Sequence, residues 1–404
     1  MTNKSPLISI DEYFKEKDGT YTLYADFRTM EDYRLFQAKF ELEQSMPAFI
    51  IKGYKSKYRI FKQKYYELNI ELINRQAIIP ASDGFLFGYE IQLNEVDIPK
   101  DDNLLLVSQN SMEGTIVPPI ILDNIPYPNS FIKTRPDSNC SVVVYNVGQG
   151  NWNEVDIDDY AALVFDTGTT ITASWTEIVS INNRIIPQYI NQHEKPMLVI
   201  SHWDKDHYNC ILGMNSQQIK SFAGCIFPCE LPNTTSIKAY DILHKELGSN
   251  NMYPVGLPKK QRNQTATPNL RNHIGRFSFY TGMSCSDRNL GGIQVFVSGL
   301  KGNLTLTGDC GWFQLMHILS NESNRLIEDR VCNIVVPHHG SGHDETYAAF
   351  LTLPNMTPGK AAISVCKNKN RYHHPSQKVM SYLQNHLNYC VKRTDEEGDI
   401  VIDL

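Results

Sequence analysis

Five apolar runs in the last two thirds of the chain are each followed at once by a cluster of polar residues. The runs span residues 141–147, 161–165, 196–200, 304–307 and 332–336. The clusters are Gly148-Gln149-Gly150-Asn151, Asp166-Thr167-Gly168, residues 201–207, Gly308-Asp309 and residues 337–341. Short apolar runs that alternate with helix-like stretches are typical of buried strands in a layered α/β fold. Because loops at strand ends converge over a rigid sheet, we expect the clusters to meet at one site.

The densest cluster carries four side chains of metal-ligand type within six residues. They are His202, Asp204, Asp206 and His207. Their spacing is too tight for one small ion to take all four, so it predicts two ions side by side. Imidazole and carboxylate ligands favour zinc, manganese or iron over calcium and magnesium. Two such ions lower the pKa of a shared water, which gives metal-bound hydroxide near neutral pH.

Two further clusters supply the remaining ligands of this predicted centre. Asp309 ends a separate strand and would bridge the two ions, and His338 or His339 would complete the second one. Adjacent residues on a chain leaving a strand point in different directions. We therefore expect only one of the two histidines to coordinate, and we favour His339, with His338 supporting the site or the substrate.

Asp166 has a supporting role by its position between a predicted strand and a glycine turn. There it would orient a metal-bound histidine through the second ring nitrogen, as metal sites require. The alternative is a carboxylate that only caps the turn.

The distribution of cysteine and histidine divides the chain. All 9 cysteines and all 12 histidines lie after Arg135. A chain of 404 residues is long enough for two or three domains of roughly 150 residues each. We therefore predict a smaller, strand-rich domain at residues 1–135, a linker around residues 126–136, and a second domain at residues 136–404. In the first domain we expect strands at residues 21–27, 48–54 and 65–73 and a helix over residues 31–44.

A basic and aromatic stretch spans residues 52–64 of the first domain. Six lysine or arginine residues interleave there with Tyr54, Tyr58 and Phe61, and no acidic residue interrupts them. Such a stretch can form a platform that stacks on unpaired bases while its cations follow the phosphates. It can equally be the solvated face of an edge strand, which is the interpretation we favour.

Charge and hydropathy exclude several classes of protein. The 38 basic and 44 acidic residues give a net charge of −6, which argues against a protein coated in positive charge to hold duplex DNA. No run approaches the ~18 apolar residues that a membrane span needs, so we expect no membrane partner. The first 30 residues lack the pattern of a secretory signal. We expect a cytoplasmic protein with reduced thiols.

The order of these motifs resembles that of the metallo-β-lactamase fold and, within it, the soluble hydrolase domain of ComEC-type competence proteins. The matching motifs are Val147-Gly148-Gln149-Gly150, Asp166-Thr167-Gly168, Ser201-His202-x-Asp204-x-Asp206-His207, Thr307-Gly308-Asp309, Pro337-His338-His339-Gly340-Ser341 and Asn370-Arg371-Tyr372-x-His374-Pro375. The resemblance covers about residues 140 to 404. It implies a four-layer αβ/βα sandwich with a metal centre between its sheets.

The resemblance also implies roles for single residues. His202 and Asp204 would hold the first ion and Asp206 and His207 the second, with Asp309 bridging and one of the paired histidines facing the metal. The resemblance places His374 near the substrate, where a protonated imidazole binds phosphate or protonates a leaving group.

Several positions depart from the family pattern or stay open. Asp204 stands where the wider superfamily has a second histidine, and the extra carboxylate makes the site more tolerant of manganese. Asn151 stands where the ComEC-type branch usually has aspartate. The remaining ligand of the first ion is open, with His244 and His273 as candidates by order alone. Trp203 and Tyr372 either stack on a base or pack in the core.

These observations predict a hydrolase with two divalent ions, zinc or manganese, that cleaves phosphoester bonds. The expected substrates are phosphodiesters of single-stranded nucleic acid or of a nucleotide, with Asp206, His374 and Asp166 as the catalytic residues. One alternative is hydrolysis of a carboxylic ester, thioester or lactone, since the same hydroxide attacks carbonyls. Another is the effector subunit of a stress or defence assembly, which would bind a protein partner through residues 1–135.

Overall fold

The computed structural model describes most of the chain. The described residues are 5–42, 48–56, 59–81, 89–93, 104–106, 115–120, 125, 127, 131, 138–261, 265, 267–284, 287–323, 331–342, 357–367 and 373–404. Tyr58, Tyr372 and most of the expected linker at residues 126–136 lie outside them. The chain divides into two compact units. The first comprises Met1–Val117, Thr172–Ile178 and Glu230–Asp241, and the second comprises Pro118–Ile171, Val179–Cys229 and Ile242–Leu404.

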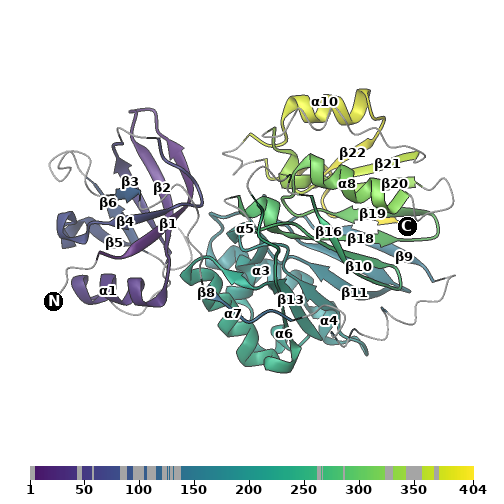
Figure 1. Cartoon of the computed structure of the whole chain (residues 1–404), viewed down its shortest axis with the longest axis horizontal. Helices are drawn as coiled ribbons and strands as arrows, with labels where there is room; N and C mark the ends of the chain where they lie inside the picture. The colour runs from purple at the N-terminus through teal and green to yellow at the C-terminus, as the bar shows by residue number, and fades with distance from the viewer. Residues whose placement is uncertain are drawn as a thin grey trace. The chain divides into compact units, whose positions relative to one another are not determined.

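The first unit contains a seven-stranded sheet in the order β5-β6-β3-β2-β1-β4-β7 (Figure 1). Its strands are β1 (Leu7–Lys15), β2 (Tyr21–Phe27), β3 (Ala48–Tyr54), β4 (Tyr65–Leu68), β5 (Ile78–Pro80), β6 (Tyr89–Gln92) and β7 (Leu104–Leu106). The strands expected at residues 21–27 and 48–54 are confirmed as β2 and β3. Helix α1 (Met30–Phe40) packs Phe36 against Phe27 and Phe49 of this sheet, which gives the unit its own aromatic core.

Two elements of this unit end earlier than predicted. The helix expected over residues 31–44 stops at Phe40, where Glu41 adopts a left-handed φ of 52°. The strand expected over residues 65–73 stops at Leu68, and the prediction is wrong for the rest. There the side chain of Asn69 accepts a hydrogen bond from the Glu71 N–H and begins the short 3-10 helix Ile70–Leu72. Asparagine side chains compete for backbone donors in this way and favour turns.

The basic and aromatic stretch packs within its own unit where the structure describes it. Tyr54 is buried in the core. Lys52 pairs with Glu90 at 2.6 Å, and Lys62 pairs with Glu12 at 2.5 Å. Two of its cations are therefore neutralised, and one of its aromatic rings is not available to stack on a base. This arrangement argues against the base-stacking platform. The edge-strand interpretation is also wrong, because β3 pairs with β2 on one side and with β6 on the other, and residues 59–64 belong to no strand.

The first unit also takes in a segment from later in the chain. In the two-stranded sheet of β8 (Thr115–Ile116) and β14 (Glu230–Leu231), a strand from residues 230–241 pairs with one from residues 1–117. The Thr234 hydroxyl lies 2.9 Å from Oδ1 of Asp26, which is fully buried at the end of β2. The Tyr65 hydroxyl donates to the carbonyl of Pro232 at 2.5 Å. These contacts tie the start of helix α7 (Thr234–Leu247) to the N-terminal sheet.

Two seven-stranded sheets make up the second unit, which is a mixed α/β structure (Figure 1). The strand order is β15-β13-β12-β11-β10-β9-β23 in one sheet and β16-β17-β18-β19-β20-β21-β22 in the other. The strands of the first are β9 (Cys140–Val144), β10 (Asn153–Ile157), β11 (Tyr160–Phe165), β12 (Met197–Val199), β13 (Gly224–Pro228), β15 (Met252–Val255) and β23 (Ile400–Asp403). Those of the second are β16 (Asn269–Ile274), β17 (Phe277–Thr281), β18 (Ile293–Ser298), β19 (Gly302–Leu306), β20 (Val331–Val335), β21 (Thr357–Ile363) and β22 (Cys390–Arg393).

Each of these sheets has a parallel half that leads into polar loops. Strands β11, β12, β13 and β15 are parallel neighbours, as are β19, β20, β21 and β22. All five apolar runs predicted as strands are confirmed, as β9, β11, β12, β19 and β20. Four of the polar clusters follow parallel strands, β11, β12, β19 and β20. Since ligands bind outside the carboxyl ends of parallel strands, these clusters are placed to form a site.

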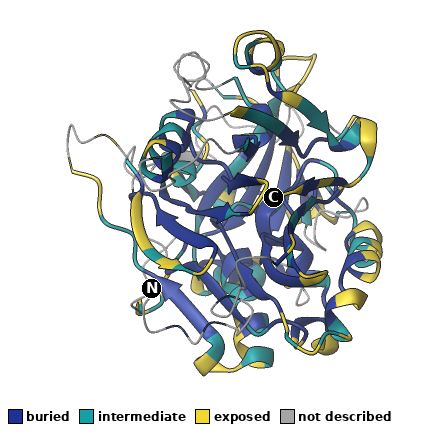
Figure 2. Cartoon of the chain, turned by 90° about the vertical axis from the view of Figure 1, so that its right-hand side faces the viewer, coloured by how far each residue is buried: buried dark blue, intermediate teal, exposed yellow. Residues whose placement is uncertain are grey.

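The main core of the second unit lies between the two sheets. It joins Val142 and Leu163 of one sheet to Val295 and Leu304 of the other, and all four are fully buried, as are most strand residues (Figure 2). The other face of the second sheet packs against α8 (Trp312–Ser323) and α10 (Gln377–Asn385). Besides α7, the described residues also form helices α3 (Trp175–Ile185), α4 (Pro187–Ile190), α5 (Lys205–Tyr208), α6 (Ser216–Ile219) and α11 (Thr394–Glu397).

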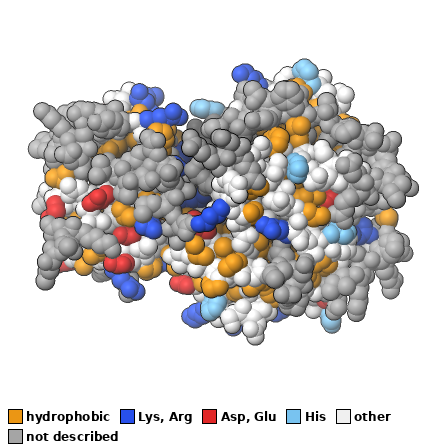
Figure 3. Space-filling view, viewed as in Figure 1, with side chains coloured by type: hydrophobic (Ala, Val, Ile, Leu, Met, Phe, Trp, Pro, Cys, Tyr) orange, Lys and Arg blue, Asp and Glu red, His pale blue; other side chains and the backbone are white. Residues whose placement is uncertain are grey.

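The surface carries mixed charge. On the face seen in Figure 3, lysine and arginine side chains are scattered among acidic, apolar and uncharged ones. Among the residues that the structure describes, no helix combines the length and apolar character that crossing a membrane requires.

Candidate metal centre

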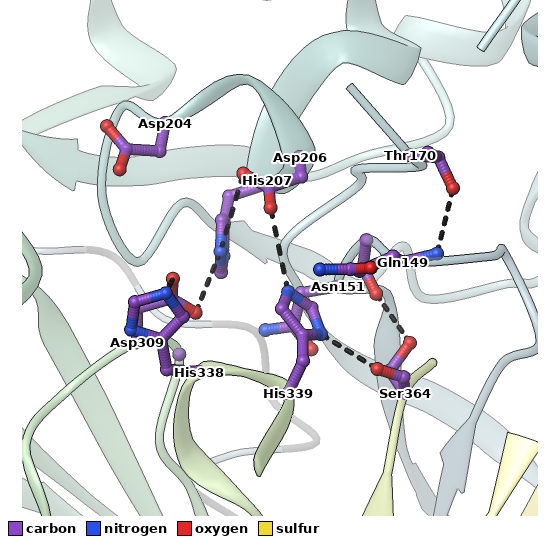
Figure 4. Close-up of polar contacts among 12 residues, drawn as sticks. Gln149, Asn151, Thr170, Asp204, Asp206, His207, Asp309, His338, His339 and Ser364 are labelled. Carbon is purple, nitrogen blue, oxygen red and sulfur yellow. Dashed lines mark hydrogen bonds and ion pairs between the residues drawn. The ribbon is translucent and has the colours of Figure 1, made fainter. Parts of the chain in front are cut away.

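Four loops of the second unit converge on one group of side chains (Figure 4). Backbone hydrogen bonds connect these loops directly. The His338 N–H donates to the Gly308 carbonyl at 3.1 Å, and the Thr167 N–H donates to the His207 carbonyl at 2.9 Å. Gly308 has a left-handed φ of 54°, and a Cβ there would lie 2.8 Å from the Ser201 Oγ. The loops that follow β12 and β19 can therefore approach this closely only with glycine at position 308.

Three histidines in this group present a ring nitrogen with no hydrogen-bond partner. Nε2 of His202, His207 and His339 is buried and makes no hydrogen bond. The three side chains are at most 4% exposed. Buried polar atoms are almost always hydrogen-bonded, and leaving one unpaired costs about 1–3 kcal/mol. Three unpaired nitrogens in one cluster therefore point to a group that the protein is built to bind there.

Each of these nitrogens faces a carboxylate at the separation that a shared ion requires. Ligand atoms about 2.1 Å from a tetrahedral ion lie about 3.4 Å apart. The distances from histidine Nε2 to carboxylate oxygen are 3.5 Å for His202–Asp204, 3.1 Å for His207–Asp309 and 3.6 Å for His339–Asp206. The residues present therefore fit a pair of divalent ions held by imidazole and carboxylate.

The ligand atoms form two overlapping groups. His202, His207 and Asp309 bring one ligand atom each within 4.8 Å of one another, and so do Asp206, His207 and His339. Five of the seven predicted ligands form these groups, and the other two lie beside them, with His338 Nε2 3.6 Å from Asp309 and Asp204 next to His202. His207 is the member that the two groups share, and Asp309 belongs to the first group, 3.1 Å from His207.

Asp204 also contacts a cation from the second sheet. Nη1 of Arg288 lies 3.5 Å from its Oδ1, while Oδ2 faces His202. Burial alone would raise the pKa of this carboxyl, but His202 and Arg288 lower it well below its usual range. Asp204 is therefore a carboxylate with one oxygen turned to Arg288 and the other to the candidate centre.

Asp166 binds one histidine of the centre at the ring nitrogen that faces away from the other candidate ligands. It is fully buried, and its Oδ2 lies 2.8 Å from Nδ1 of His207. The same carboxylate accepts hydrogen bonds from the Ser201 N–H and hydroxyl and from the Asn151 amide. Because a carboxylate can only accept, it keeps the proton of the neutral imidazole on Nδ1 and turns Nε2 towards Asp309.

The paired histidines lie on a strained turn. His338 and His339 have left-handed φ values of 48° and 52° in the short 3-10 helix η7 (Pro337–Gly340). Consecutive residues other than glycine in this region are costly and cluster at functional sites. His339 is buried, and its Nδ1 lies 2.8 Å from the Ser364 carbonyl, whereas His338 is more exposed. The turn therefore sends the two adjacent rings into different surroundings.

The remaining predicted residues fall at different distances from this group. The His374 ring lies 5.8 Å from the His338 ring in an edge-on contact, beside the centre. His244 on α7 and His273 on β16 are exposed, and neither belongs to the two groups of ligand atoms. Trp203 is buried against Tyr208 and donates to the Pro228 carbonyl, so it packs in the core.

Sequence reasoning missed two supporting residues and left a third in doubt. Ser201 contacts Asp166, His202 and His207, and its place directly before His202 could have indicated this. Ser364 follows β21 as the other polar residues follow their strands, and it holds His339. Asn151, the departure from the family pattern, donates to Asp166 at 2.7 Å and so keeps a supporting role.

Binding of divalent ions should release protons at neutral pH. Burial lowers the pKa of His207, but the charges of Asp309 and Asp166 raise it well above 6.5, and Asp206 and Asp309 raise the pKa of His339 in the same way. A ring that carries its proton must lose it to coordinate, and the raised pKa values make that proton harder to remove. We expect roughly one to two protons released per chain and an apparent affinity that rises with pH. Calorimetric titrations in buffers of different ionisation enthalpy measure this number, and equal heats in all buffers would contradict it.

Substitution of Gly168 by alanine should disrupt the centre. A Cβ at this position would lie 1.7 Å from the Asp206 carbonyl oxygen and 2.5 Å from the His207 nitrogen, so the backbone that carries two ligands must move. We expect the free energy of unfolding to fall by about 3 kcal/mol and metal affinity to fall with it. Denaturant titration and metal analysis test this. Gly291→Ala is the control, since its nearest atoms lie 3.4 Å away, and equal stability of the two variants would refute the prediction.

Sequence comparison connects this arrangement to a known protein. No protein-family model matches the chain. It is 38% identical over 103 residues to ComE operon protein 3 of Bacillus subtilis (strain 168). The chain resembles the ComEC-type hydrolases of the metallo-β-lactamase fold. The match spans 23% of this chain and only 12% of that relative.

Two solved structures are also similar. One is Tm1679, a metal-dependent hydrolase of the β-lactamase superfamily, at 10% identity and a TM-score of 0.36, covering 66% of this chain and 99% of that one. The other is CmlA, a diiron β-hydroxylase from Streptomyces venezuelae, at 10% identity and a TM-score of 0.34, covering 67% of this chain and 55% of that one.

Proposed function

We propose that this chain is a dinuclear metal-dependent hydrolase of phosphodiester bonds in single-stranded nucleic acid or a nucleotide. One observation carries the metal-dependent part of the proposal. Three buried histidine nitrogens without hydrogen-bond partners face carboxylate oxygens at separations of 3.1 to 3.6 Å. A pair of divalent ions satisfies all three nitrogens, and hydrogen bonds within the described residues satisfy none of them.

The ligand assignment follows the contacts. His202 and Asp204 would hold the first ion, and Asp206, His207 and His339 the second, with Asp309 bridging. Two of these six ligands also have a hydrogen-bond acceptor at the other ring nitrogen, Nδ1. The acceptor is Asp166 for His207 and the Ser364 carbonyl for His339. The mixture of nitrogen and oxygen ligands suits zinc or manganese, and three carboxylates among six ligands favour the harder of the two, manganese.

When bound, the ions would lower the pKa of a water so that hydroxide forms near neutral pH and would stabilise charge on the phosphoryl oxygens. The protein's own groups act around this chemistry. Asp166 holds the His207 ring in one orientation, and the strained turn of η7 presents His339. His374, whose ring lies 5.8 Å from that of His338, would give a proton to the leaving oxygen.

Charge favours phosphodiesters over the alternative substrates. Two divalent ions among three carboxylate ligands carry net positive charge, and Arg288 adds a further cation next to Asp204. An anionic phosphoryl group is attracted to such a site, and a neutral lactone or ester is not. Carboxylic ester, thioester or lactone hydrolysis remains the alternative reaction, because the same nucleophile attacks carbonyls.

We propose a two-domain organisation around this centre. Residues 136–404 would form the four-layer αβ/βα sandwich of the hydrolase, with helices outside the two sheets that already share a core. Residues 1–135, which have a sheet and an aromatic core of their own, would bind a protein partner or gate the substrate.

Metal analysis together with a substrate panel tests the proposal. Purified chain reloaded with zinc or manganese should hold about two ions. It should hydrolyse bis-p-nitrophenyl phosphate and at least one of single-stranded DNA, RNA and cyclic nucleotides. A chain that binds no ion after reloading would overturn the hydrolase assignment. A chain that opens a lactone efficiently but cleaves no phosphodiester would overturn the substrate class alone.

A further inference from the structure

One of the four histidines at the centre differs from the other three. The side chain of His338 is 35% exposed, whereas those of His202, His207 and His339 are at most 4% exposed. Its Nε2 lies 3.6 Å from Asp309, and its ring meets that of His374. His338 therefore lies on the more exposed side of the centre.

The partner at Nδ1 decides which nitrogen of a neutral imidazole carries the proton. Nδ1 of His207 faces a carboxylate, and Nδ1 of His339 faces a carbonyl oxygen. Both partners only accept, so the proton stays on Nδ1 and Nε2 keeps its lone pair for a metal ion. These two rings have the tautomer of a metal ligand.

The partner of His338 is of the opposite kind. Its Nδ1 lies 3.2 Å from the side-chain nitrogen Nδ2 of Asn289. An amide nitrogen only donates, so Nδ1 of His338 must accept and its proton must lie on Nε2. An Nε2–H has no lone pair for a metal ion. It is instead a hydrogen-bond donor directed into the centre.

The backbone around Asn289 is fixed by several hydrogen bonds. It belongs to the short 3-10 helix η6 (Arg288–Gly291), between β17 and β18. Its own N–H donates to the carboxylate of Asp287 at 3.1 Å. The Leu290 carbonyl accepts from the Gln314 amide at 2.9 Å and from the Met283 N–H at 3.1 Å. A position held this firmly suits a residue that orients another.

We propose that Asn289 is a positioning residue that keeps His338 in the Nε2–H tautomer, so that His338 donates a hydrogen bond to a phosphoryl oxygen of the substrate. The proposal rests on the proposed function for its substrate. Non-bridging phosphoryl oxygens only accept, so a neutral donor beside the ions adds to their binding without repelling the cations. It also assigns different tasks to the two adjacent histidines, with His339 on the metal and His338 on the substrate.

Nitrogen NMR of the full, metal-free chain tests the tautomer without reference to activity. The chain is labelled with ¹⁵N in the histidine rings, the His338 signals are assigned by their loss in His338→Gln, and spectra are recorded at alkaline pH. We expect the proton on Nε2 in the wild type. Asn289→Asp, of the same size, replaces the donor by an acceptor and should move the proton to Nδ1. Gln217→Ala, at an exposed amide on α6, should leave the signals unchanged. A proton on Nδ1 in the wild type would overturn the proposal.

Kinetics of the reloaded enzyme test the donor role. With bis-p-nitrophenyl phosphate, Asn289→Asp and His338→Gln should each keep about two ions and lose ~10²-fold in kcat, as expected for one lost donor. Loss of an ion in His338→Gln would show that His338 is a ligand and would refute the proposal. If the wild type hydrolyses phosphodiesters but carries the His338 proton on Nδ1, this inference is refuted and the proposed function stands. The expected tautomer in a chain that cleaves no phosphodiester would refute the proposed function and, with it, the substrate contact of His338.

Discussion

Replacement of Asp309 by alanine should remove metal and activity together. The carboxylate is 7% exposed, and its oxygens lie 3.1 Å from Nε2 of His207 and 3.6 Å from Nε2 of His338. Burial alone would raise its pKa, but these two histidines hold the pKa well below its usual range, so it is ionised and ready to coordinate. Because the proposed bridging carboxylate would contribute to both ions, we expect loss of at least one ion per chain. Turnover should fall by ~10³-fold or more, which corresponds to the several kcal/mol that metal ions supply to such a transition state.

Matched variants separate this effect from general damage to the fold. Asp309→Asn keeps the shape and one coordinating oxygen, so it should bind metal more weakly than wild type and more tightly than Asp309→Ala. Asp166→Asn changes only the partner of His207 Nδ1 and should lower metal affinity by about 10- to 100-fold. Asp403→Ala, at an exposed position on β23, should match wild type. Mass spectrometry measures the number of ions bound by each variant. An Asp309→Ala chain that retains both ions would exclude the bridging role.

The sequence alone was sufficient to predict the candidate metal ligands that lie close together in the chain. His202, Asp204, Asp206 and His207 share one loop, and the apolar run before them specifies a buried strand. Asp309 follows β19, which belongs to the other sheet, so it was predicted only because it follows a strand as the other ligands do. Its position beside them depends on how the two sheets pack against each other, which the local pattern does not specify.

The contacts that select tautomers could not be derived in this way. Ser364 is 25 residues from His339, and Asn289 is 49 residues from His338. Neither stands out as a ligand type, and their roles depend on which atom faces a ring nitrogen. His244 and His273 show the converse, since both are metal-ligand residue types that the fold places at exposed positions. Residue type restricts the candidates, and tertiary structure selects among them.

The first unit shows the same limit at the level of secondary structure. Its strands β2 and β3 are rich in β-branched and aromatic residues, with partial alternation, and were predicted at their observed bounds. Residues 69–73 have strand-like composition, yet the side chain of Asn69 satisfies a backbone donor locally and ends the strand. Residues 230–241 join this unit through contacts such as the Thr234 hydroxyl 2.9 Å from the buried carboxylate of Asp26 and the pairing of β14 with β8. Contacts between residues more than one hundred positions apart leave no pattern in the sequence.

Substitution of His374 by alanine should leave both ions in place and slow phosphodiester cleavage by ~10²-fold, in the range expected for one general acid. His374 is not within the groups of ligand atoms, and its ring contacts the substrate-side His338 at 5.8 Å. It also lines a pocket of about 350 Å³ together with Pro375 and residues of α10.

The dependence on the leaving group distinguishes the possible roles of His374. A nucleoside alkoxide is a strong base and needs a proton as its bond to phosphorus breaks, whereas p-nitrophenolate leaves without one. If His374 supplies that proton, the loss in His374→Ala should be large for a dinucleotide and should shrink towards wild-type turnover for bis-p-nitrophenyl phosphate. If the imidazole instead binds the phosphoryl group, which both substrates carry, kcat should fall by the same factor for both. Comparison of kcat for the two substrates, with metal content measured in the same samples, therefore decides between proton transfer and phosphate binding, and an equal loss would exclude the acid role.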